Sequence, residues 1–236
     1  MQTMQNTVNE SASLAQLPGE FFSKLSPETA AALQKLSFRS SYPCGITLFS
    51  ESDAPKGVYV VLEGQVKLSM NSNDGKRLSL RIAKAGDLLG FVSTLSGRPC
   101  EMTAETLYPA KVAFIPRREF IEFLALHPEV SMAVAEEMSR DYALACEQLR
   151  TVGLSSNAPE KLARLLLDWS QNGQTTERGT RCRFPLTHEE IGEFIGASRE
   201  TVTRTLSTFK SRRLVAFQGS MLTIPNRTAL ADYAHC

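Results

Sequence analysis

Two arginines and a glutamate stand close together near the C-terminal end of the 236-residue chain, in the run SRETVTR. Arg199 and Glu200 are adjacent, and Arg204 follows about one helical turn later. An arginine guanidinium can donate two hydrogen bonds to O6 and N7 of guanine, and a glutamate carboxylate can accept one from the amino group of cytosine. If these side chains begin an exposed helix, their chemistry suits the reading of base edges in the major groove of DNA.

The residues on both sides of this run predict two helices that would position it. Thr187 and Glu190 have the spacing of a capping box, Gly196 marks a turn, and Ser198 suits the N-cap of a second helix. Apolar residues recur at helical spacing in both segments: Ile191, Phe194, Ile195, Val202, Leu206 and Phe209. The pattern predicts a helix-turn-helix, followed by a hairpin wing around Gln218-Gly219-Ser220.

Charge is distributed unevenly along the chain, although the formal net charge is only +1. Residues 1–149 sum to −3 and residues 150–236 to +4, so the C-terminal part is the candidate for an anionic partner. An apolar share of 42%, with no apolar run near the length of a membrane span, predicts a globular protein without a membrane segment. The first twenty residues contain no Lys or Arg and no apolar core, so we expect no secretion signal and a cytoplasmic location.

Short β-rich runs separated by glycines occupy residues 38–115. Examples are GVYVVLEGQVKLSM and RLSLRIAKAG, which flank a hairpin signal at Asn73 to Gly75. Strands this short and evenly spaced predict an antiparallel jelly roll rather than an alternating β-α-β sheet. Together with the C-terminal helices, they predict an α+β chain of two domains.

A long helix is predicted after the barrel, because no glycine or proline occurs from Glu129 to Thr151. Apolar residues at steps of three or four predict a dimer seam formed by Val134, Met138, Tyr142, Ala145, Leu149 and Val152. The alternative is a helix that lies on its own barrel. Pro159 suits the first turn of a further helix. We therefore place a sensor domain at residues 1–126, the dimerisation helix at 127–154 and a winged helix-turn-helix DNA-binding domain at 155–236.

The block LTHEEIGEFIGASRETVTRTL resembles the signature of the DNA-binding domain of the Crp/Fnr family of bacterial transcription regulators. The resemblance extends over the glycine-punctuated barrel, the long helix and the winged helix-turn-helix. It implies that Arg199, Glu200 and Arg204 read GTGA-like half-sites, and that a homodimer binds a palindromic operator with half-sites about 34 Å apart. RNA polymerase is an implied partner if the protein is an activator. We expect contacts to the DNA backbone from Thr187, Ser198, Thr201, Thr203 and Lys210.

The same resemblance identifies GDLLGFVSTLSGRPCEMTAET, Gly86 to Thr106, with the segment that holds cyclic AMP in ligand-binding members of the family. In those members a glutamate takes the ribose hydroxyl and an arginine takes the cyclic phosphate. Here Phe91 stands at the glutamate position, and Cys100 and Glu101 stand at the arginine and Ser/Thr positions. A buried phosphate needs a paired cation, so we do not expect cyclic AMP to bind.

The candidate effector pocket comprises Gly90, Phe91, Val92, Arg98, Cys100 and Glu101. Arg98 lies two residues from the arginine position, but Pro99 fixes the local chain, so we do not expect it to replace the missing phosphate contact. Two interpretations remain open. The pocket is altered for a different, less anionic effector, which we favour, or it is filled by its own side chains.

The sequence offers few side chains that could bind the other cofactors of this family. The five cysteines are scattered and none precedes Cys44, which disfavours an iron–sulfur cluster. No histidine precedes His127, so haem would depend on Cys44, Cys100 or a partner chain. The alternative is a haem- or thiol-based sensor of the same fold. A distant one is a cupin-type metalloenzyme, which needs histidines that this barrel lacks. We predict a DNA-binding regulator and not an enzyme. For His188, in the first helix of the helix-turn-helix, the alternatives are a phosphate contact and plain exposure to solvent, and we favour the second.

Overall fold

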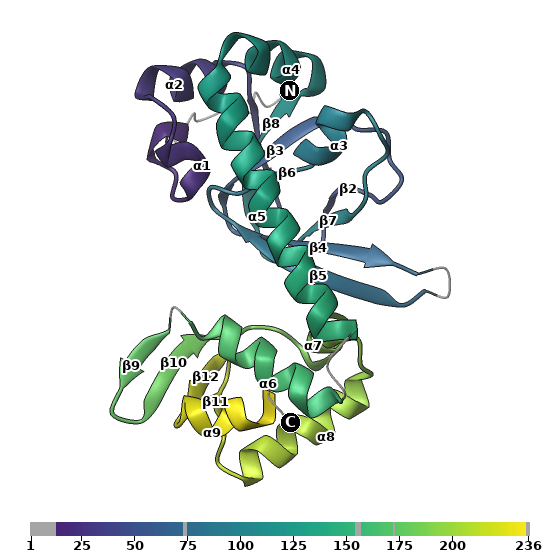
Figure 1. Cartoon of the computed structure of the whole chain (residues 1–236), viewed down its shortest axis with the longest axis vertical. Coiled ribbons are helices and arrows are strands. Elements are labelled where there is room, and N and C mark those ends of the chain that lie inside the picture. The colour runs from purple at the N-terminus through teal and green to yellow at the C-terminus, as the bar shows by residue number, and fades with distance from the viewer. Residues whose placement is uncertain (1–12, 73–74, 154–156, 172, 235–236) are drawn as a thin grey trace, which may run out of the picture. The chain divides into compact units, whose positions relative to one another are not determined.

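The computed structural model describes residues 13–72, 75–153, 157–171 and 173–234 (Figure 1). The chain divides into two compact units. One contains the chain up to Met70 with Arg81–Tyr142, and the other contains Asn71–Leu80 with the chain from Ala143 on. The predicted turn residues Asn73 and Asp74 and the predicted boundary at residues 154/155 lie outside the described residues, so the three-part division of the chain stays a prediction.

The N-terminal part is an antiparallel jelly roll, as predicted. Its strands form two four-stranded sheets with the orders β1-β8-β3-β6 and β2-β7-β4-β5, and the described pairings are antiparallel. The elements are η1 (Leu14–Gln16), α1 (Glu20–Ser23), α2 (Pro27–Lys35), β1 (Phe38–Tyr42), β2 (Thr47–Phe49), β3 (Gly57–Glu63), β4 (Gln65–Asn71), β5 (Arg77–Lys84), β6 (Leu88–Leu89), α3 (Phe91–Ser96), β7 (Thr103–Thr106), β8 (Ala110–Pro116) and α4 (Arg117–Leu126).

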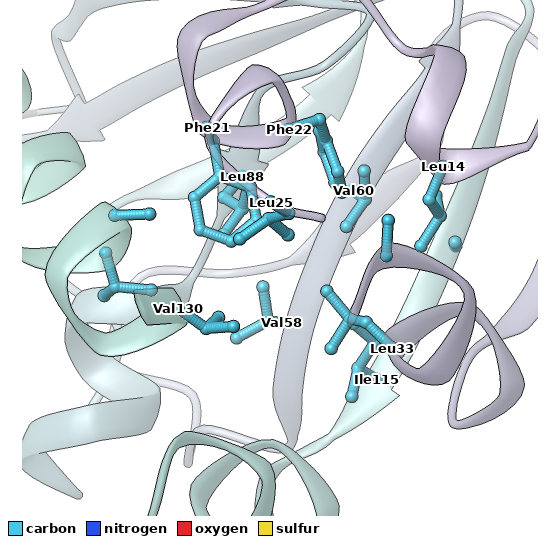
Figure 2. Close-up of a cluster of buried hydrophobic side chains, with 14 of the residues drawn as sticks. Leu14, Phe21, Phe22, Leu25, Leu33, Val58, Val60, Leu88, Ile115 and Val130 are labelled. Carbon is cyan, nitrogen blue, oxygen red and sulfur yellow. The ribbon is translucent and has the colours of Figure 1, made fainter. Parts of the chain in front are cut away.

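Alternation along β3 divides its side chains between two apolar clusters. Val58 and Val60 belong to a cluster with the N-terminal helices, while Val61 belongs to a second cluster inside the barrel and Tyr59 packs against it. Figure 2 shows the first cluster, in which side chains from short helices, strands and the long helix converge: Leu14, Phe21, Phe22, Leu25, Leu33, Val58, Val60, Leu88, Ile115 and Val130. The start of the long helix is therefore part of the core of the N-terminal unit.

The long helix α5 spans Pro128–Gly153, and the helical and wing elements follow it as predicted (Figure 1). Asn157 caps α6, and Pro159 occupies its first turn. A third sheet has the order β11-β12-β10-β9. The elements are α6 (Ala158–Trp169), β9 (Gln174–Thr176), β10 (Gly179–Arg183), α7 (His188–Ile195), α8 (Arg199–Ser211), β11 (Ala216–Gln218), β12 (Met221–Ile224), α9 (Arg227–Ala231) and η2 (Asp232–Ala234). Among the described residues, no helix combines the length and the apolar content needed to cross a membrane.

Gly192 in α7 is packed closely against the turn that follows the helix. A Cβ built on Gly192 would stand 2.5 Å from the carbonyl oxygen of Ala197. We expect Gly192→Ala to lower the free energy of unfolding of this domain by about 1–3 kcal/mol, because the backbone must move to admit the methyl group. Urea unfolding followed by the fluorescence of Trp169, the chain's only tryptophan, measures this change.

The matched control is Gly153→Ala in the last turn of α5. A Cβ at Gly153 has nothing within 4 Å, so this variant should keep or slightly raise the stability through the better helix propensity of alanine. Equal stability of the two variants would show that the approach of Gly192 to Ala197 imposes no steric limit.

Candidate nucleic-acid interface and sensor pocket

The first helix of the helix-turn-helix, α7, begins and ends as its sequence predicts. The Thr187 hydroxyl accepts a hydrogen bond from the Glu190 backbone N–H at 3.2 Å, and the Glu190 carboxylate accepts one from the Thr187 backbone N–H at 2.8 Å. These two bonds form the predicted capping box. Gly196 ends the helix with φ +63°, a left-handed conformation that costs glycine least.

Packing against α7 fixes which face of α8 is exposed. Ser198 caps α8 by accepting a hydrogen bond from the Thr201 backbone N–H. Val202, Leu206 and Phe209 are at most 2% exposed and form the inner face, as predicted. Ile191 of α7 is buried as well, and the two helices are in contact. The outer face of α8 is thus set by the core of the domain.

The outer face of α8 carries the three candidate base-reading residues. At about 100° per residue, Glu200 and Arg204 lie opposite the buried side chains, whereas Arg199, in the first turn, lies about 60° from Val202, at the edge between the exposed and the buried faces. All three side chains are exposed. The Thr203 hydroxyl donates to the Arg199 carbonyl at 2.9 Å, and the Thr208 hydroxyl donates to the Arg204 carbonyl at 3.1 Å. The face therefore presents two guanidinium groups and one carboxylate without an apolar side chain among them.

The place of Glu200 at the start of α8 favours the ionised form of its carboxyl. Hydrogen bonds from its own backbone N–H and from the Ser198 hydroxyl hold the pKa of its carboxyl below the usual value, and Arg199 adds to this effect. An ionised carboxylate only accepts hydrogen bonds. That property matches the amino group of cytosine, which is a donor.

The predicted DNA-backbone residues surround this face, but Thr201 differs from the others. Thr187, Ser198, Thr203 and Lys210 are exposed. Thr201 is half-buried, and its hydroxyl oxygen lies 3.1 Å from that of Ser198. Their contacts with phosphate stay a prediction.

The wing lies beside the recognition helix. The Nζ atom of Lys210 stands 5.1 Å from the centre of the Phe217 ring, which belongs to β11. A cavity of about 290 Å³ lies next to this contact, and its lining includes Phe184, His188, Leu206, Lys210, Phe217 and Ser220. The cation of Lys210 is thus held at the junction of α8 and the wing.

His188 is half-buried and links the two helices, whereas the sequence led us to expect an exposed side chain. Its Nδ1 lies 2.8 Å from the Thr203 hydroxyl oxygen. Because that hydroxyl already donates its proton to the Arg199 carbonyl, Nδ1 must carry the proton and donate it. Burial lowers the pKa of His188, and the nearby Lys210 and Arg199 lower it further. The neutral ring therefore ties the start of α7 to the second turn of α8.

This neutral histidine predicts a loss of stability in acid. Between pH 6.5 and the lowered pKa, the unfolded chain binds more protons at His188 than the folded chain does. Its contribution is fully present above pH 6.5 and is lost as the pH falls through the folded pKa. His188→Asn, which keeps an N–H donor but does not titrate, should remove this part of the pH dependence. Unfolding followed by Trp169 fluorescence measures it, and identical pH profiles for both proteins would contradict the assignment.

The predicted dimer seam on α5 requires one correction. Val134 is 2% exposed because it packs into the core of its own N-terminal unit, so it is not available to a partner helix. Met138, Tyr142 and Leu149 are 41%, 74% and 69% exposed, Ala145 is exposed and Val152 is half-buried. The exposed apolar stripe thus begins after the first turns of α5, where the helix leaves its own core.

The structure brings most of the predicted pocket residues together but leaves no room between them. Gly90, Phe91, Val92 and Glu101 line one cavity and Cys100 lines another, and each cavity holds about 20 Å³. Pockets for small ligands usually measure about 300–1,000 Å³, and about 20 Å³ admits little more than one water. Phe91 is only 2% exposed and belongs to the apolar core.

Arg98 does not belong with the other pocket residues. It is exposed and lines neither cavity, so its inclusion among the predicted pocket residues was wrong. Arg81 of β5 lines the first of these cavities and Lys56 lines the second, and sequence reasoning missed both cations. Burial raises the pKa of the Cys100 thiol, and the Glu101 carboxylate accepts a hydrogen bond from the Ser93 hydroxyl at 2.7 Å. The pocket wall therefore offers a neutral thiol and a fixed carboxylate.

Comparison with known proteins finds matches for both the jelly roll and the helix-turn-helix domain. A model of the Crp-like helix-turn-helix domain matches residues 160–233, and a model of the cyclic nucleotide-binding domain matches residues 39–127. The chain is 28% identical over 214 residues to a CRP-like cAMP-activated global transcriptional regulator of Mycobacterium tuberculosis. The aligned residues cover 90% of this chain and 95% of that protein.

Solved structures share the fold. FixK2 from Bradyrhizobium japonicum superposes with a TM-score of 0.73 at 22% identity, over 84% of this chain and 96% of that one. The c-di-GMP responsive global regulator CLP of Xanthomonas campestris gives a TM-score of 0.75 at 20% identity, over 85% of this chain and 100% of that one. The fold and the domain matches define a DNA-binding transcription regulator with a cyclic nucleotide-binding domain. The chain belongs to the Crp/Fnr family of transcription regulators.

Proposed function

We propose that the protein is a homodimeric regulator that binds palindromic operators with GTGA-like half-sites. The observation that carries this proposal is the outer face of α8, where Arg199, Glu200 and Arg204 are exposed on a helix held by α7. Arginine and glutamate there match the guanine acceptors and the cytosine amino group of such half-sites. The bacterial cytoplasm is its proposed location, and RNA polymerase is a partner if the regulator activates transcription.

The proposed dimer forms along the exposed stripe of α5. Met138, Tyr142, Ala145 and Leu149 recur at steps of three or four and lie within one narrow sector of the helix surface. Three of these side chains are large, apolar and more than 40% exposed. A second copy of the same helix would cover this stripe and give the dimer the two-fold symmetry of a palindromic operator.

The sensor domain is proposed to work without cyclic AMP. A relative in Mycobacterium tuberculosis is named as cAMP-activated, and cyclic AMP carries a phosphate that needs a cation. Here the pocket contains Phe91 and the carboxylate of Glu101 at the ligand positions, and its cavity is about 20 Å³. The small cavity supports the interpretation of a pocket filled by its own side chains over that of a pocket altered for another effector.

The spacing of half-sites tests the dimer and the recognition helix together. In fluorescence anisotropy at fixed salt, the wild type should bind a labelled palindrome with half-sites about 34 Å apart. A duplex with the same half-sites moved apart by half a helical turn should bind much more weakly, because its second half-site faces away from the second recognition helix. Equal affinity for the two duplexes would rule out simultaneous reading of two half-sites by one rigid dimer.

A further inference from the structure

Arg81 lines the small cavity beside Gly90 and Phe91, and it is paired with two carboxylates of the same chain. Its guanidinium lies 3.0 Å from a carboxylate oxygen of Asp87 and 3.3 Å from one of Asp141. The three side chains are 17%, 19% and 21% exposed, so the cluster is largely shielded from water. Asp87 is held further by the backbone N–H of Lys84, which donates to it at 3.0 Å. One arginine thus connects the β5–β6 turn to the long helix α5.

The charges around this arginine disfavour an added anion. Arg81, Asp141 and Glu101 line the same cavity, and Asp87 contacts Arg81 from the side. One guanidinium therefore contacts two carboxylates, and a third carboxylate, that of Glu101, lines the same cavity. Burial raises the pKa of Asp141, although Arg81 opposes this effect. A phosphate entering here would have to displace a carboxylate from Arg81, and it would meet the repulsion of the others.

Arg81 and Asp141 lie close to the two positions where the chain enters and leaves the N-terminal unit. Arg81 is the first residue of the N-terminal unit after the segment Asn71–Leu80, which belongs to the other unit. Asp141 lies one residue before Tyr142, where α5 leaves the N-terminal unit. The ion pair therefore joins two segments of the N-terminal unit near the positions where each passes out of it, and it fastens this part of α5 to β5.

We infer that Arg81 is a positioning residue, which holds α5 on the sensor domain through Asp141 and thereby keeps the dimer competent for a palindromic operator without an added anionic effector. The inference rests on the proposed function, because the palindrome is the readout. By holding α5, Arg81 is proposed to fix the spacing between the two recognition helices of the dimer. It therefore affects only the binding of duplexes that engage both recognition helices. A duplex with a single half-site needs one DNA-binding domain and is indifferent to this spacing.

The test measures the affinity of full-length protein, dialysed free of nucleotide, for two labelled duplexes. One carries the GTGA palindrome and the other a single GTGA half-site. Arg81→Ala and Asp141→Asn should each weaken binding of the palindrome by about 5- to 150-fold, the range of ordinary coupling between sites, and should leave the single half-site unchanged. Arg81→Lys should recover part of the loss. Adding cyclic AMP to the wild type should change neither affinity.

Lys111→Ala is the matched control, because Lys111 pairs with Glu63 at a surface where the two side chains are 46% and 57% exposed. It should bind both duplexes as the wild type does. Wild-type affinity of Arg81→Ala and Asp141→Asn for the palindrome would overturn the inference, and so would a wild type that binds the palindrome only after cyclic AMP is added. Equal weakening on both duplexes would also overturn it, because that result indicates damage to the fold. Failure of the wild type to prefer GTGA over a scrambled sequence would instead refute the proposed function.

Discussion

Arg204→Ala is expected to weaken binding of a GTGA palindrome by about 1–3 kcal/mol for each half-site, because a guanidinium that donates two hydrogen bonds to guanine is lost in both subunits. Arg204 lies on the side of α8 opposite the buried Val202 and Phe209, so its removal leaves the domain core intact. Selectivity should fall together with affinity, since a scrambled duplex offers no correctly placed guanine. Anisotropy titrations of the palindrome and of a scrambled duplex, at one salt concentration, measure both quantities.

Lys210→Ala is the control that separates base reading from phosphate binding. Lys210 is exposed at the C-terminal end of α8, beside the wing. Its removal should weaken binding to every sequence by a similar factor and reduce the salt dependence of binding by about one counterion per subunit. If Arg204→Ala weakened the palindrome and the scrambled duplex equally, Arg204 would be a backbone contact and the reading of bases would have to be assigned elsewhere.

Tyr142→Arg is expected to dissociate the dimer. Tyr142 is 74% exposed in the middle of the apolar stripe of α5, and in a two-fold dimer two new cations would be brought together among the apolar side chains of that stripe. Burying an unpaired charge costs several kcal/mol, which is a large part of the free energy of a typical dimer. Sedimentation equilibrium of the wild type and the variant gives the dissociation constant directly.

Leu144→Arg is the control on the opposite side of the same helix. Leu144 is 46% exposed and two residues from Tyr142, which places it about 160° away around α5. The account predicts that Leu144→Arg remains dimeric and that Tyr142→Arg becomes monomeric and loses the palindrome but keeps a single half-site. The reverse result would place the interface on the other face of α5.

Local rules predicted the recognition unit well. The capping box at Thr187, the left-handed Gly196 and the cap at Ser198 depend on residues at most three positions apart, so the sequence displays them directly. The wing and the jelly roll were predicted for the same reason, because period-two alternation and glycine turns are local signals. These parts place Arg199, Glu200 and Arg204 without any knowledge of distant contacts.

Contacts between distant residues were not predictable in this way. His188 and Thr203 are 15 positions apart, and Arg81 and Asp141 are 60 positions apart. No spacing rule connects such pairs, and each depends on how the folded elements meet. The burial of Val134 was not predictable either. Its heptad-like spacing is equally consistent with a dimer seam and with a helix packed on its own barrel. Only the packing of α5 on the N-terminal unit decides between the two.

The selectivity of the wild-type protein for its operator shows whether α8 reads bases. The measurement is the ratio of its affinities for the GTGA palindrome and for a scrambled duplex of the same length and composition, at one physiological salt concentration and without cyclic AMP. We expect a ratio of about 10³ or more, as in other specific DNA-binding proteins. A ratio near one, with or without cyclic AMP, would contradict it.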